Sequence, residues 1–484
     1  MIYDKIIETK NEQKTPVFMS GKTFHSKYNP EREAVQLVQN TKESSFFAVT
    51  GLGAGFYVQE LRKVFPSSFI LVIEKSEEDI SFLLNNIPEL KNLFDEKTKI
   101  CSISKLSETL PQYYLPALYP TFSVFSVQSW LSEIDMQSLF DTLNLTLKNI
   151  SADFATQAHF GKIWQKNIIS NLKIQKKAES HFPTEKKCII AAAGPSLDFI
   201  EDKIKNKRDE YYVIATDTAY RSLSLRKIIS DAVISIDGQE ISHSHFMRRT
   251  ASETTFFFEL TACPSAARKI QTHSGSTIFL TSQHPLSQYA DNHSPESFIQ
   301  IDSSSGTVTI AALDLAVKAG FKDIFLYGAD FGYVNNKPYA KGTYLDRSFY
   351  NKGTKLSTAE TSFSRLMYRS SLINVSENKK TTELLQFYEN QLFQWAAKNN
   401  CSIKKENDSF RISSSGDKKL PENLKPFDFT TFINRIKNEP DERIRNMLTL
   451  PYAAWFQKHN NYPGQNITDD YSKLALNFIL RYNF

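Results

Sequence analysis

The residues best suited to chemistry lie in two turns of small residues, each of which opens a segment with helical periodicity. The turns are Gly194, Pro195 and Ser196 in one case, and Ser304, Ser305 and Gly306 in the other. Free N–H groups at a helix start, together with the helix dipole and nearby hydroxyls, favour a bound phosphate or carboxylate. We therefore predict that both turns contribute to a site for a phosphate or a carboxylate. The alternative is that they are structural turns and helix caps.

Acidic side chains follow three other apolar segments. They are Asp217, with Thr218 beside it, Asp237 and Asp330. A carboxylate in such a place can grip a ribose or accept a proton as a general base. Asp237 and Glu240 together also offer oxygen ligands of the kind that magnesium prefers. The sequence does not indicate a magnesium requirement, and we predict no metal site.

An aromatic and basic loop follows Asp330. Tyr333 and Tyr339 carry hydroxyls that can bond a departing phosphate, and the cations of this loop can neutralise its charge. We predict Asp330, Tyr333, Tyr339 and Asp237 as the catalytic group.

These turns punctuate a series of short apolar segments, which alternate with helical patterns. The segments are 188–192, 212–216, 232–236, 255–258, 277–280 and 323–327. Continuous apolar runs are typical of strands buried on both faces, and alternation with helices predicts a doubly wound, mostly parallel sheet. Because ligands of such sheets bind at the carboxyl ends of the strands, the predicted site residues should lie along that edge. We assign this α/β domain to residues 181–350.

The segment before it, residues 1–180, is predicted to be a second Rossmann-like α/β domain. An apolar strand at 46–50 leads into the glycine turn 51–55, and a second strand at 69–73 ends at Glu74. A cofactor could bind this turn, with Glu74 accepting from ribose hydroxyls. Alternatively the glycines only make a tight turn. Residues 351–484 are predicted to form a helical domain for packing and partner recognition.

Bulk composition narrows the function classes. The chain has 484 residues and a net charge of only +5, with acids interleaved among the cations, so we expect no nucleic-acid partner. Its four cysteines lie far apart, which argues against a disulfide framework or zinc site. Neither a signal peptide nor a membrane span of about 18 apolar residues is found. We expect a cytoplasmic protein.

Five motifs in this order resemble the motility accessory factor family of flagellin glycosyltransferases. They are A-G-P-S-L-D at 193–198, I-A-T-D-T at 214–218, V-I-S-I-D at 233–237, S-S-G-T at 304–307 and L-Y-G-A-D-F-G-Y at 326–333. The segment 25–30 and the glycine turn 51–55 are similar to the same family. Its central domain is shared with 6-hydroxymethylpterin diphosphokinase-like proteins, and it looks like the bacterial sialyltransferases that use CMP-sialic acid.

The resemblance implies roles for individual residues. Gly194, Pro195 and Ser196 would hold the donor's phosphate and sugar, and Asp217 would lie on the nucleotide side. The second turn would meet the donor's carboxylate or its cytidine. Tyr333 and Tyr339 would assist the departing phosphate.

This chain departs from the sialyltransferases in one respect, because it has no histidine between His293 and His459. A base would have to be Asp330, Asp346, Asp237 or an earlier histidine such as His284. The resemblance implies a glycosyltransferase that needs no cofactor and moves a nonulosonic acid from a CMP donor to Ser or Thr of flagellin. The alternatives are an ATP-dependent pterin diphosphokinase-like enzyme and a non-catalytic flagellin-binding factor.

Overall fold

The structure is a computed structural model of the 484-residue chain. It describes residues 1–246, 252–273, 276–304, 306–406, 409–459 and 476–481. The chain forms two compact units, residues 1–161 with 450–472 and residues 162–449 with 473–484. The boundaries predicted near residues 180 and 350 both fall inside the second unit.

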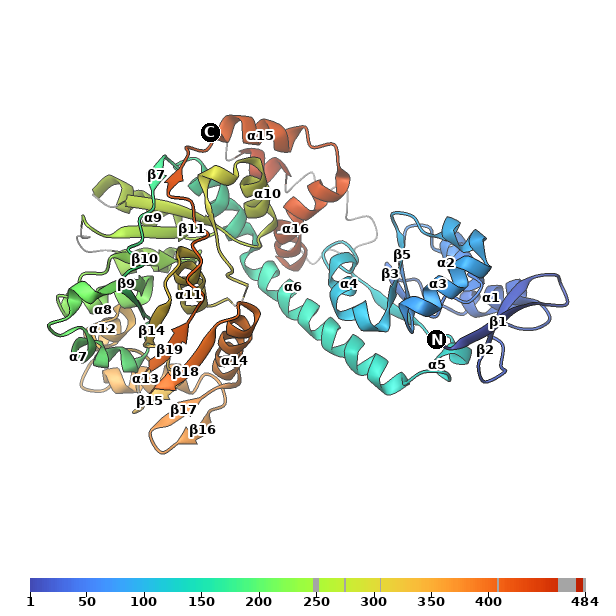
Figure 1. Ribbon diagram of the computed structural model, residues 1–484, viewed down its shortest axis with the longest axis horizontal. Helices are drawn as coiled ribbons and strands as arrows, with labels where there is room; N and C mark the ends of the chain where they lie inside the picture. Colours follow the sequence, from blue (N-terminus) through green and yellow to red (C-terminus); the bar gives the residue numbers. More distant parts are fainter. Residues whose placement is uncertain (247–251, 274–275, 305, 407–408, 460–475, 482–484) are drawn as a thin grey trace. The chain divides into compact units, whose positions relative to one another are not determined.

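The second unit is built on a large sheet with the strand order β13-β12-β11-β10-β9-β8-β14-β19-β18 (Figure 1). Its strands are β8 (Lys187–Ala191), β9 (Tyr211–Thr216), β10 (Ala232–Ser235), β11 (Thr255–Glu259), β12 (Ser276–Thr281), β13 (Ile299–Gln300), β14 (Asp323–Tyr327), β18 (Ser402–Glu406) and β19 (Ser409–Ser413). Pairing is parallel from β13 to β14 and antiparallel beyond it. The predicted doubly wound, mostly parallel sheet is confirmed.

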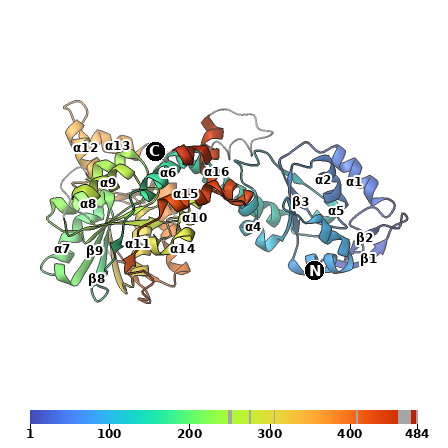
Figure 2. The same ribbon diagram turned by 90° about the horizontal axis from the view of Figure 1, so that it is seen from above.

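Helices cover both faces of this sheet because successive strand residues point to opposite sides. Ile189 and Val213 pack in the core under α7 (Ile200–Ile204), α8 (Asp217–Leu225), α9 (Pro264–His273) and α10 (Pro285–His293). Their neighbours Ile190 and Ile214 pack in the other core, under α11 (Val308–Ala319) and α14 (Glu383–Lys398). Figure 2 shows α8 and α9 on one side of the strands and α11 and α14 on the other.

The order of the strands reverses at β8. From β8 the chain adds β9 to β13 in one direction, and it then returns through α11 to place β14 on the other side of β8. Such a switch point opens a crevice at the carboxyl ends of the two strands. The turns after β8 and β14 therefore border that crevice.

The region predicted to be helical does contain helices. They are α12 (Tyr344–Lys352), α13 (Ala359–Met367), α14, α15 (Phe429–Lys437) and α16 (Glu442–His459). It also supplies β18 and β19 to the large sheet, and β16 (Ile373–Ser376) and β17 (Lys379–Thr381) to a small sheet with β15 (Tyr333–Val334). Strand β20 (Asn423–Leu424) pairs with β7 (Ala178–Glu179).

The first unit contains a parallel four-stranded sheet of order β5-β4-β3-β6, as predicted for a Rossmann-like domain. Its elements are β1 (Tyr3–Glu8), β2 (Lys14–Phe18), α1 (Pro30–Gln39), β3 (Phe46–Thr50), α2 (Phe56–Val64), β4 (Phe69–Glu74), α3 (Glu77–Asn86), β5 (Thr98–Ser102), α4 (Leu106–Tyr113), β6 (Phe122–Phe125) and α5 (Gln128–Leu131). Helix α6 (Met136–Leu172) begins in the first unit and ends in the second.

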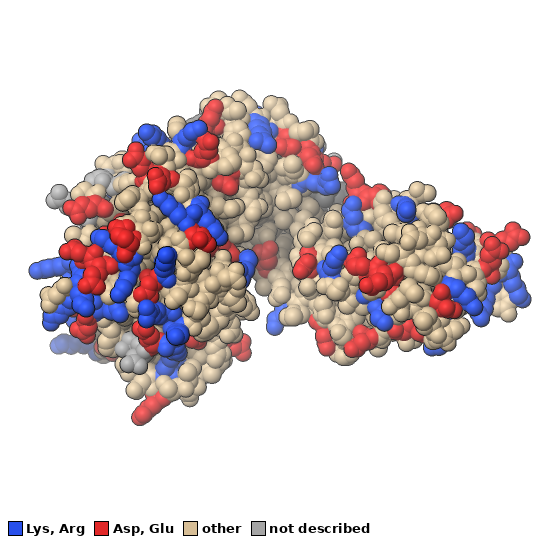
Figure 3. All heavy atoms as spheres, in the orientation of Figure 1, with Lys and Arg blue, Asp and Glu red and all other residues tan. Residues whose placement is uncertain are grey.

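Charges of both signs are mingled over the face of the molecule in Figure 3, as the interleaved sequence leads one to expect. Among the described residues, no helix has the length and apolar character needed to cross a membrane.

Candidate functional site

One carboxylate ties together the two turns that border the switch point. Oδ2 of Asp330, after β14, accepts hydrogen bonds from the backbone N–H and from the hydroxyl of Ser196, both at 3.0 Å. The Ser196 hydroxyl also accepts from the N–H of Gly328 at 3.0 Å. Ser196 is buried and Asp330 is half-buried. Two predicted site residues that lie 134 positions apart are thereby in direct contact.

In the first turn, N–H groups that we expected to bind phosphate instead donate to other groups of the protein. The N–H of Gly194 donates to the carbonyl of Gly328 at 2.8 Å, and that of Ser196 donates to Asp330. A Cβ added at Gly194 would lie 2.2 Å from Oδ2 of Asp330. Only glycine permits this approach. The anion that this turn holds is therefore the protein's own carboxylate.

A cavity of about 300 Å³ lies beside this contact. Pro195 and Ser196 line it from the first turn, and Ala329 and Asp330 line it from the end of β14. Most of the remaining lining comes from the small sheet with its loops and from β18 and β19, and it includes Glu406. The cavity is also lined by three cations, Lys337, Lys379 and Lys405. Pockets for small ligands start at about this size.

The backbone near the cavity is strained at Phe331. Phe331, directly after Asp330, has φ +45°, in a region that a bulky side chain rarely occupies. Its carbonyl accepts from the Thr381 hydroxyl at 2.8 Å, which holds the distorted loop. Strain of this kind persists where the surroundings over-determine it, and it concentrates at ligand sites.

The two predicted tyrosines lie near each other but do not line the cavity. Burial raises the pKa of both Tyr333 and Tyr339, and for Tyr339 the charge of Tyr333 adds to the effect while Arg369 opposes it. Both side chains are partly buried, so their hydroxyls stay protonated at neutral pH.

Asp217 and Thr218 form a separate group at the end of β9. Oδ1 of Asp217 accepts from the N–H and hydroxyl of Thr218, and its Oδ2 accepts from Ser235 at 2.6 Å. Asp217 is buried, and its oxygens bond side chains of the sheet edge. Neither Asp217 nor Thr218 lines the cavity at the switch point.

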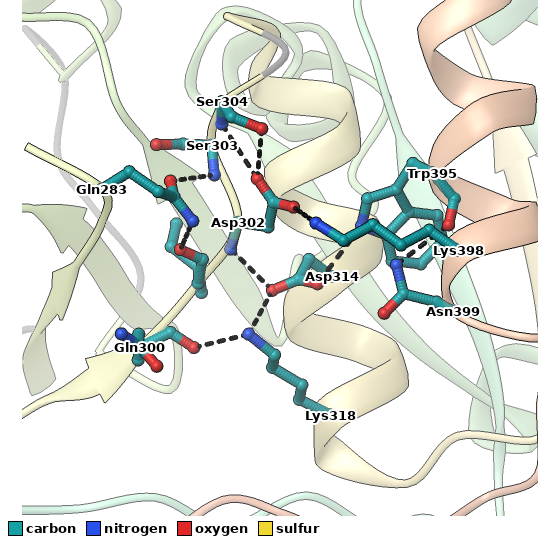
Figure 4. A network of polar contacts seen from close by, with 11 residues as sticks. Gln283, Gln300, Asp302, Ser303, Ser304, Asp314, Lys318, Trp395, Lys398 and Asn399 are labelled. Carbon is teal, nitrogen blue, oxygen red and sulfur yellow. Dashed lines mark hydrogen bonds and ion pairs between the residues drawn. The ribbon is translucent and has the colours of Figure 1, made fainter. Parts of the chain in front are cut away.

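The second turn is fixed by a polar network at the start of α11 (Figure 4). Asp302 accepts from the N–H and hydroxyl of Ser304, and its own N–H donates to Asp314 at 2.8 Å. Burial alone would raise the pKa of Asp302, but the hydrogen bonds from Ser304 and Lys398 lower it. Gly306 has φ +70°, which glycine tolerates. Ser305, predicted with them, lies outside the described residues.

A second carboxylate completes this network. Asp314 is buried, pairs with Lys318 at 2.8 Å and accepts from the Trp395 indole at 3.3 Å. The predicted turn is thus braced from α11 and α14 together (Figure 4). The sequence reading did not include Asp302 or Asp314, although an acid directly before a serine turn is a recognisable capping signal.

The other candidate bases serve structural contacts. The Asp237 carboxylate accepts from the N–H of Gln239 at 3.0 Å, while that of Glu240 accepts from Ser265 at 2.8 Å, so the two carboxylates bond different residues. Asp346 accepts from the N–H of Gly342 at 2.8 Å near the start of α12. His284 caps α10, and burial lowers its pKa to about 3. Among the described residues, no group of three or more His, Cys, Asp or Glu is placed to hold a metal ion.

Sequence reasoning missed a buried carboxylate at the same edge of the sheet. Glu259 ends β11, and the Ser282 hydroxyl donates to it across the neighbouring strand end. Burial raises the pKa of Glu259 to about 7, while hydrogen bonds from Ser282 and Thr261 oppose the rise. The sequence feature that could have identified Glu259 is its place directly after the apolar run 256–258.

The end of α6 fixes the loops after β10 and β11. The Asn167 amide donates to the carbonyls of Gly238 and Thr261, both at 2.9 Å. One turn later, the Asn171 amide donates to the carbonyls of Leu260 and Ala262. These loops lack a strand partner for those carbonyls, and the two amides satisfy them.

The glycine turn of the first unit is filled by the protein itself. A Cβ added at Gly51 would lie 2.6 Å from the Trp130 ring, and one added at Gly53 would lie 2.4 Å from Phe24. The N–H of Ala54 donates to Nε2 of the buried His25 at 3.0 Å. The glycines therefore make room for aromatic side chains, in agreement with the structural alternative.

Glu74 is equally engaged. It is fully buried and accepts from the Tyr3 hydroxyl at 2.8 Å, the Leu52 N–H at 2.8 Å and the Trp130 indole at 3.0 Å. Burial raises its pKa to about 7, and these hydrogen bonds limit the rise. The carboxylate expected to meet a ribose instead closes a packed core.

Comparison with known proteins places this chain in a class. The model of the 6-hydroxymethylpterin diphosphokinase MptE-like family matches residues 162–336. The solved structure of the MAf glycosyltransferase from Magnetospirillum magneticum AMB-1 superposes with a TM-score of 0.55, covering 99% of this chain and 86% of that one at 12% identity. The chain is thus an α/β protein with the fold of a motility accessory factor glycosyltransferase.

Uncharacterised proteins of Treponema pallidum (strain Nichols) are similar in sequence. One is 33% identical over 172 residues, which cover 32% of this chain and 82% of that relative. Another is 42% identical over 125 residues, which cover 26% of this chain and 44% of that relative. Residues 162–336 therefore carry a domain of the MptE-like family, as the resemblance predicted. The predicted similarity to sialyltransferases stays a prediction.

Proposed function

We propose that this chain is a glycosyltransferase that moves a nonulosonic acid from a CMP donor to a Ser or Thr hydroxyl of flagellin, in the cytoplasm. The observation that carries the proposal is the cavity at the switch point, where Ser196 and Asp330 join the turns after β8 and β14. The fold shared with the MAf glycosyltransferase supports the reaction class. The proposed donor and acceptor are those that the resemblance to the motility accessory factors implies.

The proposed chemistry is a single inverting displacement. The acceptor oxygen forms a bond to the anomeric carbon, the bond from that carbon to the phosphate oxygen breaks, and CMP leaves. Asp330 takes the acceptor's proton, because it is the only one of the predicted catalytic residues that lines the cavity. Tyr333 and Tyr339 keep their assignment to the departing phosphate, which they would reach when the donor is bound.

The reaction is tested with purified protein, a CMP-linked nonulosonic acid and flagellin. We expect transfer to flagellin and release of CMP, and Asp330→Asn should lower the rate by about a hundredfold or more, as for loss of a general base. Asp323→Asn is the matched control, since Asp323 begins the same strand and pairs with Arg411 away from the cavity. Unchanged turnover in Asp330→Asn would contradict the assignment of the base.

A second candidate function is favoured by the family match itself. An ATP-dependent diphosphokinase acting on a pterin would bind ATP in a magnesium-dependent manner and would not respond to CMP. Calorimetric titration with CMP and with ATP plus magnesium separates the two enzymes. Binding of flagellin without turnover of either nucleotide would favour a non-catalytic binding factor.

A further inference from the structure

We propose that Lys379 is the residue that recognises the anionic group of the ligand in the switch-point cavity. The anion is a phosphate or a carboxylate, whose negatively charged oxygens the ammonium group would bond. This inference rests on the proposed function, which defines the ligands considered. It names a specificity residue at the start of β17, outside the five motifs.

The first argument concerns which donors remain for an anion. The N–H groups of Gly194 and Ser196 bond Gly328 and Asp330, so the turn after β8 offers them to no ligand. Asp330 adds a negative charge at the same place. An anionic ligand in this cavity therefore needs its positive partner from the three lysines that line it.

The second argument selects Lys379 among the three. Lys405 already pairs with Glu389 at 3.8 Å and lies over the Phe410 ring, and Lys337 is exposed. Lys379 is half-buried, and its side-chain ammonium forms no hydrogen bond or ion pair with any residue that the structure describes. A partly buried ammonium without such a partner is costly, and an incoming anion would relieve that cost.

The third argument is that the fold makes room for this side chain. A Cβ added at Gly332 would lie 2.7 Å from Cε of Lys379, so the lysine stem runs across a glycine. The adjacent strained residue Phe331 is held from Thr381 in the same strand as Lys379. Burial lowers the pKa of the Lys379 ammonium. The nearby charges of Glu389 and Asp330 raise this pKa, and the charge of Lys405 lowers it.

The test is calorimetric titration of the full chain and its variants with cytidine, CMP, CMP-N-acetylneuraminic acid, inorganic phosphate and ATP plus magnesium. Lys379→Met should weaken binding of the anionic ligand by about tenfold or more, since charge-assisted hydrogen bonds are lost. Lys379→Arg should stay within a few-fold of the wild type, and cytidine should bind all variants alike. Lys380→Met is the matched control, because Lys380 is the next residue and reaches Tyr368 instead of the cavity.

The pattern of losses identifies the anion. Weaker binding of CMP and of its sugar conjugate would assign the phosphate to Lys379, and weaker binding of the conjugate alone would assign the carboxylate. The wild type could bind none of the cytidine ligands and still bind phosphate or ATP in a manner that depends on Lys379. That outcome would contradict the proposed function and support this inference. Lys379→Met that binds every anion as tightly as the wild type overturns the inference, as does a wild type that binds no anion at millimolar concentration.

Discussion

The Ser196 hydroxyl donates to Oδ2 of Asp330 and accepts from the N–H of Gly328, each at 3.0 Å. One buried side chain thus satisfies both ends of the turn after β14. The contact fixes the carboxylate at the edge of the switch-point cavity. Four predictions follow from this and related contacts.

Replacing Ser196 by alanine should destabilise the protein by about 1–3 kcal/mol, because the Gly328 N–H loses its partner in a buried place. Turnover should fall as well, since Asp330 loses the hydrogen bond from the Ser196 hydroxyl. Urea unfolding measures the first effect and the transfer assay the second. Ser224→Ala, at an exposed position on α8, should change neither. Equal stability of the two variants would contradict the bonding scheme.

Gly194→Ala should displace Asp330, although its backbone φ of −73° suits any residue. The added methyl would lie 2.2 Å from the carboxylate oxygen, which must move. We expect a stability loss of about 1–3 kcal/mol and a loss of ligand binding at the cavity. Gly353 also has an ordinary φ, and a methyl added there would lie 3.2 Å from its nearest neighbour, a carbonyl oxygen. Gly353→Ala should therefore change stability and ligand binding little. A fully active Gly194→Ala would refute the close approach.

Glu259→Gln should change how stability depends on pH. Burial raises the pKa of Glu259 in the folded protein to about 7, against 4.5 as its ordinary value, so the folded state resists ionisation. Below about pH 4.5, Glu259 is protonated in both the folded and the unfolded state and does not reduce the free energy of unfolding. Between about pH 4.5 and pH 7 it ionises more readily in the unfolded state, so the free energy of unfolding falls progressively. The variant should gain on the wild type by up to about 3 kcal/mol between pH 5 and pH 8. Unfolding curves across that range test this, and a pH-independent difference would contradict the assignment.

Trp130→Phe should destabilise the first unit without affecting ligand binding in the second. The substitution removes the indole N–H from a fully buried carboxylate, which costs about 1–3 kcal/mol. Thermal unfolding and CMP titration measure the two properties. Wild-type protein should also bind neither a dinucleotide nor S-adenosylmethionine at the glycine turn. Saturable binding of either at that turn would show that Phe24 and Trp130 do not fill it.

The apolar strands and the turns that follow them could be predicted because their signals are local. Continuous runs such as 188–192 and 323–327 marked the parallel sheet, and the glycine and serine turns marked its carboxyl edge. Strands β18 and β19 escaped detection, since their residues are mostly charged or polar and mostly exposed. They form because β14 offers them an open edge, which is a tertiary cause.

Contacts between distant residues were beyond sequence reasoning. Asp330 and Ser196 were both predicted as site residues, but no local sequence pattern indicates that they form a hydrogen bond across 134 positions. The sequence left open whether Glu74 faces a ligand, and only the fold brings Tyr3 and Trp130 to it from 71 and 56 positions away. Of the lysines that line the cavity, Lys379 and Lys405 lie on β17 and β18, strands that the sequence did not reveal, whereas Lys337 belongs to the predicted basic loop.

The filled glycine turn also shows how one architecture can serve twice within a single chain. In the first unit, the Tyr3 hydroxyl and the Trp130 indole give Glu74 the donors that a bound ribose and base would otherwise supply. The carboxyl edge of this sheet is therefore closed by the protein's own side chains, whereas the same edge of the large sheet borders an open cavity.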